Sequence, residues 1–352
     1  MIIPFFLASR GCPHRCSFCN QELSGGDDPR ELTPVYFHRK VQSYLAGKAT
    51  GRKSRREAQI AFYGGNFTGL DPAEQERLLG MARRYLETGA VSQVRISTRP
   101  DALDRQTAKR LAAAGVRTVE IGAQSLVDEV LTASRRGHDA AAVTAAVAAA
   151  KEENMEVFLH LMAGLPGDNE ERFAITLSRT IALLPRGVRL HPTLVLAGTP
   201  LAQAYLQGQY APLTLPEAVD ICRRACVRLE EAGIVVIRLG LQDTEALRKP
   251  GSVLGGPYHP AFGALVAAAG WRERAFALLA GTDLRNREVV FHIPDGAESA
   301  FRGNRNGNLK ALQDYFGLAS LRIIAQGNTF GYRIGGPERG SRGRNCFPGG
   351  KE

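Results

Sequence analysis

Short apolar runs rich in β-branched and aromatic residues alternate with amphipathic stretches from the N-terminus to about residue 240. The runs predict strands at 4–7, 59–62, 94–97, 118–121, 157–161 and 188–196, with a further strand at 234–239. The amphipathic stretches predict helices at 71–89, 104–115, 139–153, 173–184 and 214–233. This serial order predicts an α/β fold with a parallel sheet, and its six βα units favour an open, partial (β/α)6 barrel of the TIM type.

The pattern changes after Gly240. A stretch rich in Gly and Pro is followed by a predicted helix at 260–279, a strand at 288–292, a helix at 308–316 and a strand at 321–325. We therefore expect a core domain at 1–240 and a small α+β accessory domain at 241–336. The polar, Gly-rich segment 337–352 is predicted to be a disordered tail.

Composition narrows the class of protein. The chain has 352 residues, 44% of them hydrophobic and 23% charged, which excludes a disordered chain, a collagen-like repeat and a disulfide-stapled miniprotein. No apolar run is long enough to span a bilayer and no secretory leader is visible, so we expect a cytoplasmic protein with no membrane partner. The net charge of +10 is compatible with a polyanionic partner or with an Arg- and Ala-rich composition set by a GC-rich genome.

Three of the six cysteines, Cys12, Cys16 and Cys19, lie together just after the first predicted strand. Such close spacing without a secretory context indicates metal binding rather than disulfides. Three thiolates can hold three irons of a cubane cluster and leave the fourth iron open for a non-protein ligand. The alternative is a structural zinc site with His14 as the fourth ligand. Cys222 and Cys226 are expected to form a buried pair on a helix face.

The spacing Cys-x₃-Cys-x₂-Cys, with Phe18 before the last cysteine, resembles the signature of the radical S-adenosylmethionine (SAM) superfamily. The resemblance implies that Cys12, Cys16 and Cys19 hold a [4Fe-4S] cluster, which Phe18 shields. It also implies that SAM binds at the open iron and is cleaved by one electron to a 5′-deoxyadenosyl radical. An external electron donor of the flavodoxin or ferredoxin type would supply that electron.

Further motifs resemble the SAM contacts of the superfamily. The turn Gly64-Gly65-Asn66 corresponds to a Gly-Gly-Glu turn that receives the SAM ammonium group, with Asn66 in the place of the glutamate. Ser97 and Arg99, at the end of the third predicted strand, correspond to a position that contacts the ribose or the carboxylate.

The fourth and fifth strands end in two more such motifs. Gln124 and Arg136 match the Gly-x-Gln-Ser and Arg-x-His stretch of oxygen-independent coproporphyrinogen III oxidase relatives, which implies that both residues bind SAM. His160 stands where those relatives often carry an Asp. The stretch that begins with Gly164, Leu165 and Pro166 resembles a Gly-Leu-Pro-Gly segment that makes backbone contacts to adenine.

The substrate remains open at this point. The region 191–210 resembles the radical core of Elongator catalytic subunits, which favours tRNA modification. A basic stretch at 38–56 and a second cluster at Arg302, Arg305 and Lys310 are compatible with RNA as a partner. The alternatives are a radical oxidase of small molecules of the tetrapyrrole type and a non-catalytic iron–sulfur or haem-binding protein. The oligomeric state is not predicted.

Overall fold

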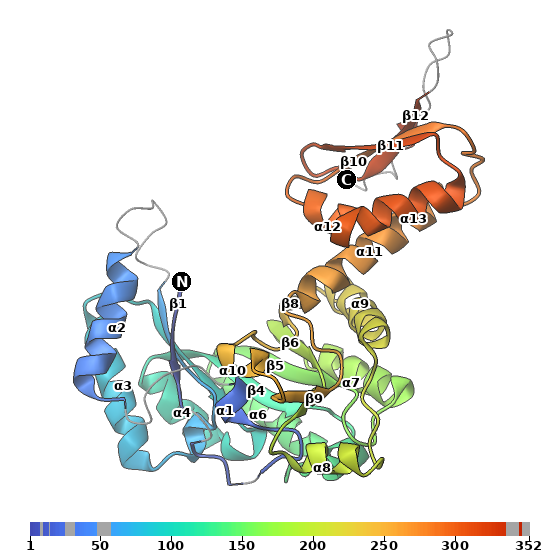
Figure 1. The fold of residues 1–352 in the computed structure, drawn as a ribbon. Helices are drawn as coiled ribbons and strands as arrows, with labels where there is room; N and C mark the ends of the chain where they lie inside the picture. The colour runs from blue at the N-terminus through green and yellow to red at the C-terminus, as the bar shows by residue number, and fades with distance from the viewer. Residues whose placement is uncertain (8–9, 14, 25–31, 48–57, 336–344, 347–352) are drawn as a thin grey trace. The chain divides into compact units, whose positions relative to one another are not determined.

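The computed structural model describes residues 1–7, 10–13, 15–24, 32–47, 58–335 and 345–346. The chain forms two compact units, Met1–Pro260 and Ala261–Glu352 (Figure 1). The expected boundary at residue 240 falls inside the first unit. The segment after it packs back on that unit, since the Ala197 N–H donates a hydrogen bond to the Ser252 carbonyl at 2.9 Å and Gly256 lies against the Thr193 carbonyl.

A curled parallel sheet forms the first unit, with its strands in sequence order. They are β1 (Ile2–Phe6), β2 (Gln59–Tyr63), β3 (Gln93–Thr98), β4 (Val116–Gln124), β5 (Glu156–Ala163), β6 (Gly187–Pro192) and β8 (Val235–Leu239). Every neighbouring pair is parallel, which confirms the predicted partial barrel of the TIM type. Because parallel strands end at the same edge, the loops after them converge on one side of the sheet.

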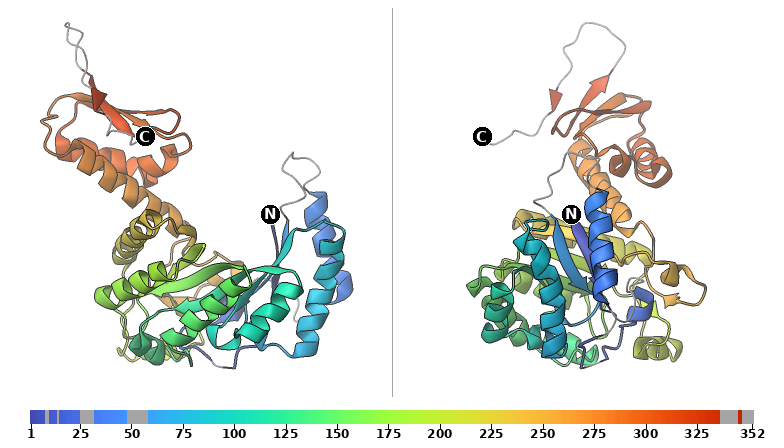
Figure 2. Two further views of the ribbon diagram at one scale, coloured as in Figure 1. Left: turned by 180° about the vertical axis from the view of Figure 1, so that it is seen from behind. Right: turned by 90° about the vertical axis from the view of Figure 1, so that its left-hand side faces the viewer.

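Helices cover the outer face of this sheet (Figure 2). The predicted helices correspond to α3 (Pro72–Glu87), α4 (Arg105–Ala113), α6 (Ala140–Glu152), α7 (Glu170–Ala182) and α9 (Leu215–Glu231). Their starts follow from side-chain caps, such as the capping box between Thr214 and Glu217. The structure adds α1 (Gln21–Ser24), α2 (Pro34–Ala46), α5 (Asp128–Ala133), α8 (Pro200–Leu206) and α10 (Glu245–Arg248).

One predicted strand is divided in the structure. The run 188–196 forms β6 and then β7 (Val195–Leu196), which leaves the main sheet and pairs antiparallel with β9 (Val253–Gly255). The division occurs at Thr193, whose backbone N–H and hydroxyl both bond the Ala163 carbonyl at 2.9 Å and end the ladder with β5. The small β7–β9 sheet carries Leu194 and Leu196 into an apolar cluster with Leu247.

The second unit has the predicted α+β composition. It contains α11 (Phe262–Leu279), β10 (Glu288–Ile293), α12 (Glu298–Arg302), α13 (Gly307–Phe316), β11 (Ser320–Ala325), β12 (Gly331–Gly335) and β13 (Asn345–Cys346). Strand β10 pairs parallel with β11 and antiparallel with β12. Its core includes Phe291, Phe301 and Leu312. Apart from β13, the tail predicted at 337–352 lies outside the described residues.

Across the ranges that the structure describes, we find no helix combining the length and apolar character that crossing a bilayer requires. Cys222 is fully buried on α9 and Cys226 is partly buried one turn later, both as free thiols. Burial raises the pKa of the Cys226 thiol to about 11 and that of Cys222 still further.

Candidate functional site

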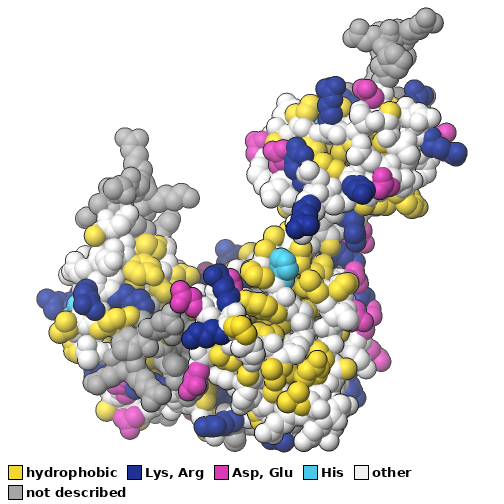
Figure 3. Space-filling model, viewed as in Figure 1, with side chains coloured by type: hydrophobic (Ala, Val, Ile, Leu, Met, Phe, Trp, Pro, Cys, Tyr) yellow, Lys and Arg dark blue, Asp and Glu magenta, His cyan; other side chains and the backbone are white. Residues whose placement is uncertain are grey.

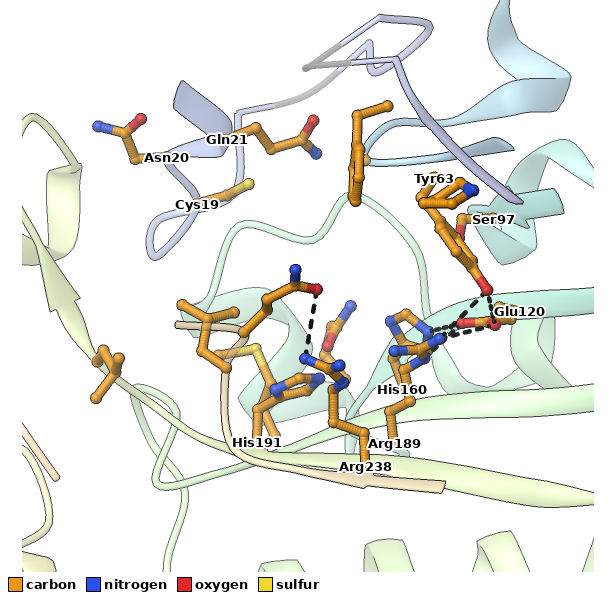
Figure 4. Close-up of a pocket in the computed structure, with 18 of the residues that line it drawn as sticks. Cys19, Asn20, Gln21, Tyr63, Ser97, Glu120, His160, Arg189, His191 and Arg238 are labelled. Atoms are coloured by element: carbon orange, nitrogen blue, oxygen red, sulfur yellow. Dashed lines mark hydrogen bonds and ion pairs between the residues drawn. The ribbon is translucent and has the colours of Figure 1, made fainter. Parts of the chain in front are cut away.

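A cleft lies at the carboxyl ends of the strands of the first unit. It consists of two adjoining cavities of about 790 Å³ and about 680 Å³, which share Phe18, Cys19, Gly64, Gln124 and His160 among their lining residues. The smaller cavity borders the cysteine loop, and the larger one reaches the side chains of β5, β6 and β8. Figure 4 shows Cys19 and Gln21 on one side of the space and Arg189, His191 and Arg238 on the other. Volumes of this size suit a cofactor together with a substrate.

The cysteine loop is held in place by backbone hydrogen bonds. Ser17 donates to the Ser134 carbonyl at 3.0 Å and accepts from the Leu201 N–H at 2.8 Å, which ties the loop to α5 and α8. Cys12 is partly buried, Cys16 is buried and Cys19 is exposed, and all three line the smaller cavity. Among the described residues, no three His, Cys, Asp or Glu side chains are grouped closely enough to hold one metal ion; His14 lies outside those residues.

The surrounding protein raises the pKa of two of these thiols. Burial is the main reason that the pKa of Cys12 is raised, and the neighbouring Cys16 adds to the shift while Arg99 and Arg136 oppose it. The loss of water around its sulfur, together with Cys16 and Cys12, raises the pKa of Cys19 to about 12, against the opposing effects of Arg136 and Gln21. Binding of a cationic metal centre would therefore release protons from these thiols, as expected for a metal site with thiolate ligands.

Arg136 connects the cysteine loop to the sheet. Its Nη1 lies 3.0 Å from Cys16 Sγ, its Nη2 donates to the Gly122 carbonyl, and its own carbonyl accepts from Arg99 Nη2 at 2.6 Å. Arg99 also forms a bidentate pair with Asp101 at 2.8 and 2.9 Å. Its Nη1 is buried and has no hydrogen-bond partner among the described residues. The smaller cavity is thus bordered by two oriented guanidinium groups.

Asn66 occupies a different place from the one that the superfamily motif implies. It is 1% exposed and lies outside the lining of both cavities. Its amide donates to the Gly11 carbonyl at 2.8 Å, and its side-chain oxygen accepts from the Arg99 N–H and the Thr98 hydroxyl, each at 3.0 Å. Asn66 therefore joins the base of the cysteine loop to the end of β3.

A buried polar cluster fills the inner end of the cleft. Glu120, fully buried on β4, bonds Arg95 at 2.6 Å. It also bonds Arg189 at 2.6 Å and His160 at 2.7 Å, and it accepts from the Tyr63 hydroxyl at 3.1 Å (Figure 4). Burial alone would raise the pKa of Glu120, but His160 and Arg189 hold it well below its usual range. The carboxylate stays ionised because its partners replace the water that burial removes.

Sequence reasoning missed most of this cluster. It singled out His160 but assigned no role to Glu120, Arg95, Arg189 or Arg238. The signal that could have found them is their spacing: each is a charged residue inside an apolar run, at a position that the two-residue period of a strand directs to the interior.

Most of the candidate residues line the cleft, and the others lie outside its lining. Those that line the cleft are Cys12, Cys16, Phe18, Cys19, Gly64, Gly65, Ser97, Arg99, Gln124, Arg136 and His160. Gly164, Leu165 and Pro166 are outside the lining of both cavities. Leu165 packs with Cys16 and Phe18, and the Gly164 carbonyl accepts from the Tyr210 hydroxyl at 2.6 Å.

Two family models match this chain. The Radical SAM superfamily model matches residues 6–179, and the Radical_SAM C-terminal domain model matches residues 185–271. The chain belongs to the radical SAM superfamily and is an enzyme of that class. The second match begins within the barrel and ends within α11, so residues 272–352 lie outside both models.

Individual relatives share part of the chain. It is 28% identical over 231 residues to the tRNA uridine(34) acetyltransferase of Dehalococcoides mccartyi, covering 57% of this chain and 50% of that protein. It is 27% identical over 220 residues to protein YhcC of Escherichia coli, covering 58% and 67%. The chain spans about half the length of the acetyltransferases that it matches.

A solved structure supports the same fold. Archaeal Elp3 from Methanocaldococcus infernus, lacking residues 1–46, matches with a TM-score of 0.57 and 22% identity, covering 68% of this chain and 59% of that one. At this level of identity the likeness concerns the fold alone.

Proposed function

We propose that this protein binds a [4Fe-4S] cluster through Cys12, Cys16 and Cys19 and uses it to cleave SAM. The observation that carries the proposal is that these three thiols line one cavity together with Arg99 and Arg136. When bound, the cluster supplies one electron to SAM, yielding methionine and a 5′-deoxyadenosyl radical that takes a hydrogen atom from the substrate.

The cavity offers groups that match the polar parts of SAM. Arg99 Nη1 is a buried donor without a partner among the described residues, which suits a carboxylate. Gln124 lines the cavity with a left-handed backbone (φ +68°), at a break in the β4–β5 register. Such backbone conformations are costly for residues other than glycine and concentrate at binding sites. Gly64, also left-handed (φ +74°), presents its backbone to the cavity without a side chain in the way.

The remaining contacts position and protect the site. Arg136 orients Cys16 and offsets the negative charge that a thiolate carries. Phe18 and Leu165 pack with Cys16 and keep water from the loop. Because a reduced cluster is needed for each turnover, we propose that the protein accepts electrons from an external donor of the flavodoxin or ferredoxin type.

We further propose an RNA substrate of the tRNA class. Several relatives are tRNA uridine(34) acetyltransferases, and this likeness and the net charge of +10 support this choice. In the basic stretch at 38–56, Arg39 and Lys40 lie on α2, whereas Lys48, Arg52, Lys53, Arg55 and Arg56 lie outside the described residues. Arg302 in the second cluster is paired with Glu298 at 2.9 Å, and acidic groups are interspersed with basic ones on the face in Figure 3.

Anaerobic turnover tests the first proposal. The purified, cluster-loaded protein is incubated with SAM and dithionite, and 5′-deoxyadenosine and methionine are quantified by mass spectrometry. We expect both products from the wild type and a loss of at least about 100-fold in Cys19→Ala. Cys226 is a free thiol on α9, far along the chain from the three cysteines, so Cys226→Ala should behave as the wild type. An intact cluster that never cleaves SAM would instead support a non-catalytic binder.

Nucleoside analysis tests the RNA substrate. We expect one modified nucleoside to disappear from the tRNA of a deletion strain and to return on complementation. We also expect tRNA binding whose affinity falls steeply as salt rises, since phosphate contacts release counterions. An unchanged nucleoside profile together with salt-independent or absent tRNA binding would exclude tRNA and favour a small-molecule substrate.

A further inference from the structure

The larger cavity has a cationic floor that SAM binding leaves unexplained. Its floor is formed by side chains from β5, β6 and β8, the last strands of the sheet, whereas Cys19 lies on the other side of the cleft (Figure 4). Among the described lining residues, Lys40, Arg189 and Arg238 are basic and Glu120 is the single acid.

Strand register places the two arginines side by side. Arg189 on β6 is the direct partner of Arg238 on β8, and on its other side it is the partner of His160 on β5. Neighbouring strands lie about 4.8 Å apart, and partners in register direct their side chains to the same face. Like charges directly opposite each other destabilise a sheet unless something of the opposite charge intervenes.

Glu120 forms a direct ion pair with only one member of this pair. Arg189 uses its Nε and Nη2 to bond Glu120, which Arg95 and His160 also share. For Arg238 the structure records a 3.4 Å hydrogen bond to Gln242 and no carboxylate within ion-pair distance among the described residues. Burial and the nearby Arg189 lower the pKa of Arg238, and Tyr63 and Glu120 offset this only in part, consistent with a cation that lacks a direct anionic partner.

One ring nitrogen of a histidine at the same floor lacks a partner. The Nδ1 atom of His191 is buried and has no hydrogen-bond partner among the described residues. His191 lies two residues beyond Arg189 on β6 and therefore on the same face of the sheet. Burial, His160 and Arg189 lower its pKa to about 3, so the ring is neutral at physiological pH. Figure 4 shows its side chain beside Arg238.

We propose that Arg238, with Arg189 beside it, binds an oxyanion group of the substrate, either a carboxylate or a phosphate. That the bound anion belongs to the substrate rests on the proposed function. A planar guanidinium pair binds such oxyanions with paired hydrogen bonds, and the anion would separate two cations that the fold otherwise holds together. The group would anchor the substrate on the side of the cleft opposite the cysteine loop and so orient its reacting carbon.

Titration with small anions tests this site. Inorganic phosphate and acetate are titrated into the full, cluster-loaded chain at constant ionic strength with chloride as the balancing anion, in the presence and absence of SAM, and binding is followed by calorimetry. We expect saturable binding of at least one probe. Arg238→Gln should weaken it at least about 10-fold, whereas Arg238→Lys should retain part of it because the charge remains. Arg105→Gln, at an arginine whose side chain is 80% exposed, is the matched control and should bind as the wild type.

The outcomes separate this inference from the proposed function. Tighter phosphate binding indicates a nucleotide phosphate as the source of the anion, and tighter acetate binding indicates an organic acid; either supports the site. A protein that cleaves SAM but shows no saturable binding, or binding equal in Arg238→Gln and the wild type, overturns the inference and leaves the function standing. Anion binding that depends on Arg238 in a protein unable to cleave SAM supports the site and removes the function.

Discussion

The two sides of the cleft are held together in different ways. The outer side, which carries the cysteines, is a loop fixed by backbone hydrogen bonds and by Asn66, a neutral side chain with four partners. The inner side is a set of charged side chains on neighbouring strands, with Glu120 shared among Arg95, Arg189 and His160.

This difference separates the two tasks of the site. A loop fixed by backbone bonds and a neutral amide can accept a charged metal centre without breaking the buried ion pairs of the sheet. Strand-borne charges are rigidly spaced, and removing one member leaves the others buried and unpaired. We therefore expect changes on the outer side to affect cofactor loading, and changes on the inner side to affect stability and substrate binding.

The largest effect is expected from the cysteines. Cys12→Ala removes one of the ligands that we propose for the cluster, so iron and sulfide per chain should fall nearly to zero. The free energy of unfolding of the cluster-free chain should change by less than about 1 kcal/mol, because Cys12 is only partly buried. Iron and sulfide analysis after anaerobic reconstitution checks this, with Cys226→Ala as the control. Full iron loading in Cys12→Ala would show that Cys12 is not a ligand of the cluster.

Glu120→Gln should produce the opposite result. Removing the buried carboxylate leaves Arg95 and Arg189 without their shared partner, which should cost about 3–5 kcal/mol of stability. Urea unfolding measures the loss. The folded fraction at low temperature should still take up iron, since the cysteine loop does not contact Glu120 through any hydrogen bond in the described chain. A stability equal to that of the wild type would show that the cluster of charges is not needed for folding.

A substitution at Asn66 tests the connection between the cysteine loop and the end of β3. Asn66→Ala leaves the Arg99 N–H, the Thr98 hydroxyl and the Gly11 carbonyl without this partner, and should cost about 2–3 kcal/mol. It should also lower cluster loading, since the base of the cysteine loop is released. Thermal unfolding and iron analysis measure the two effects on one preparation. If Asn66 bound SAM directly, SAM affinity would fall while stability stayed unchanged.

The last predicted effect is a pH dependence, which is negligible at neutral pH and grows as the pH falls. Burial lowers the folded-state pKa of His191 to about 3, below the unfolded value of about 6.5. The unfolded chain therefore binds the extra proton, and stability is lost as pH falls below about 6.5, by at most about 1.4 kcal/mol per pH unit. His191→Gln should flatten the curve between about pH 6.5 and pH 4. An unchanged slope in that variant would show that His191 is protonated in the fold.

The sequence predicted the barrel because its strands are apolar runs between capped helices, and local patterns of this kind survive folding. The cysteine motif was visible because its spacing is short. Asn66 could not be placed, since its partners Gly11 and Arg99 are brought to it only by the sheet. The shared position of Arg189 and Arg238 was also hidden, because strand register depends on pairing between segments far apart in the chain.

The central claim is that three cysteines hold a cluster whose fourth iron is open to SAM. Electron paramagnetic resonance of the reduced, reconstituted protein tests it directly, because a ligand that binds the cluster changes the spectrum. We predict a [4Fe-4S]⁺ signal that shifts when SAM is added and is absent from Cys12→Ala. A protein that carries zinc, or a cluster whose spectrum SAM leaves unchanged, would contradict the account.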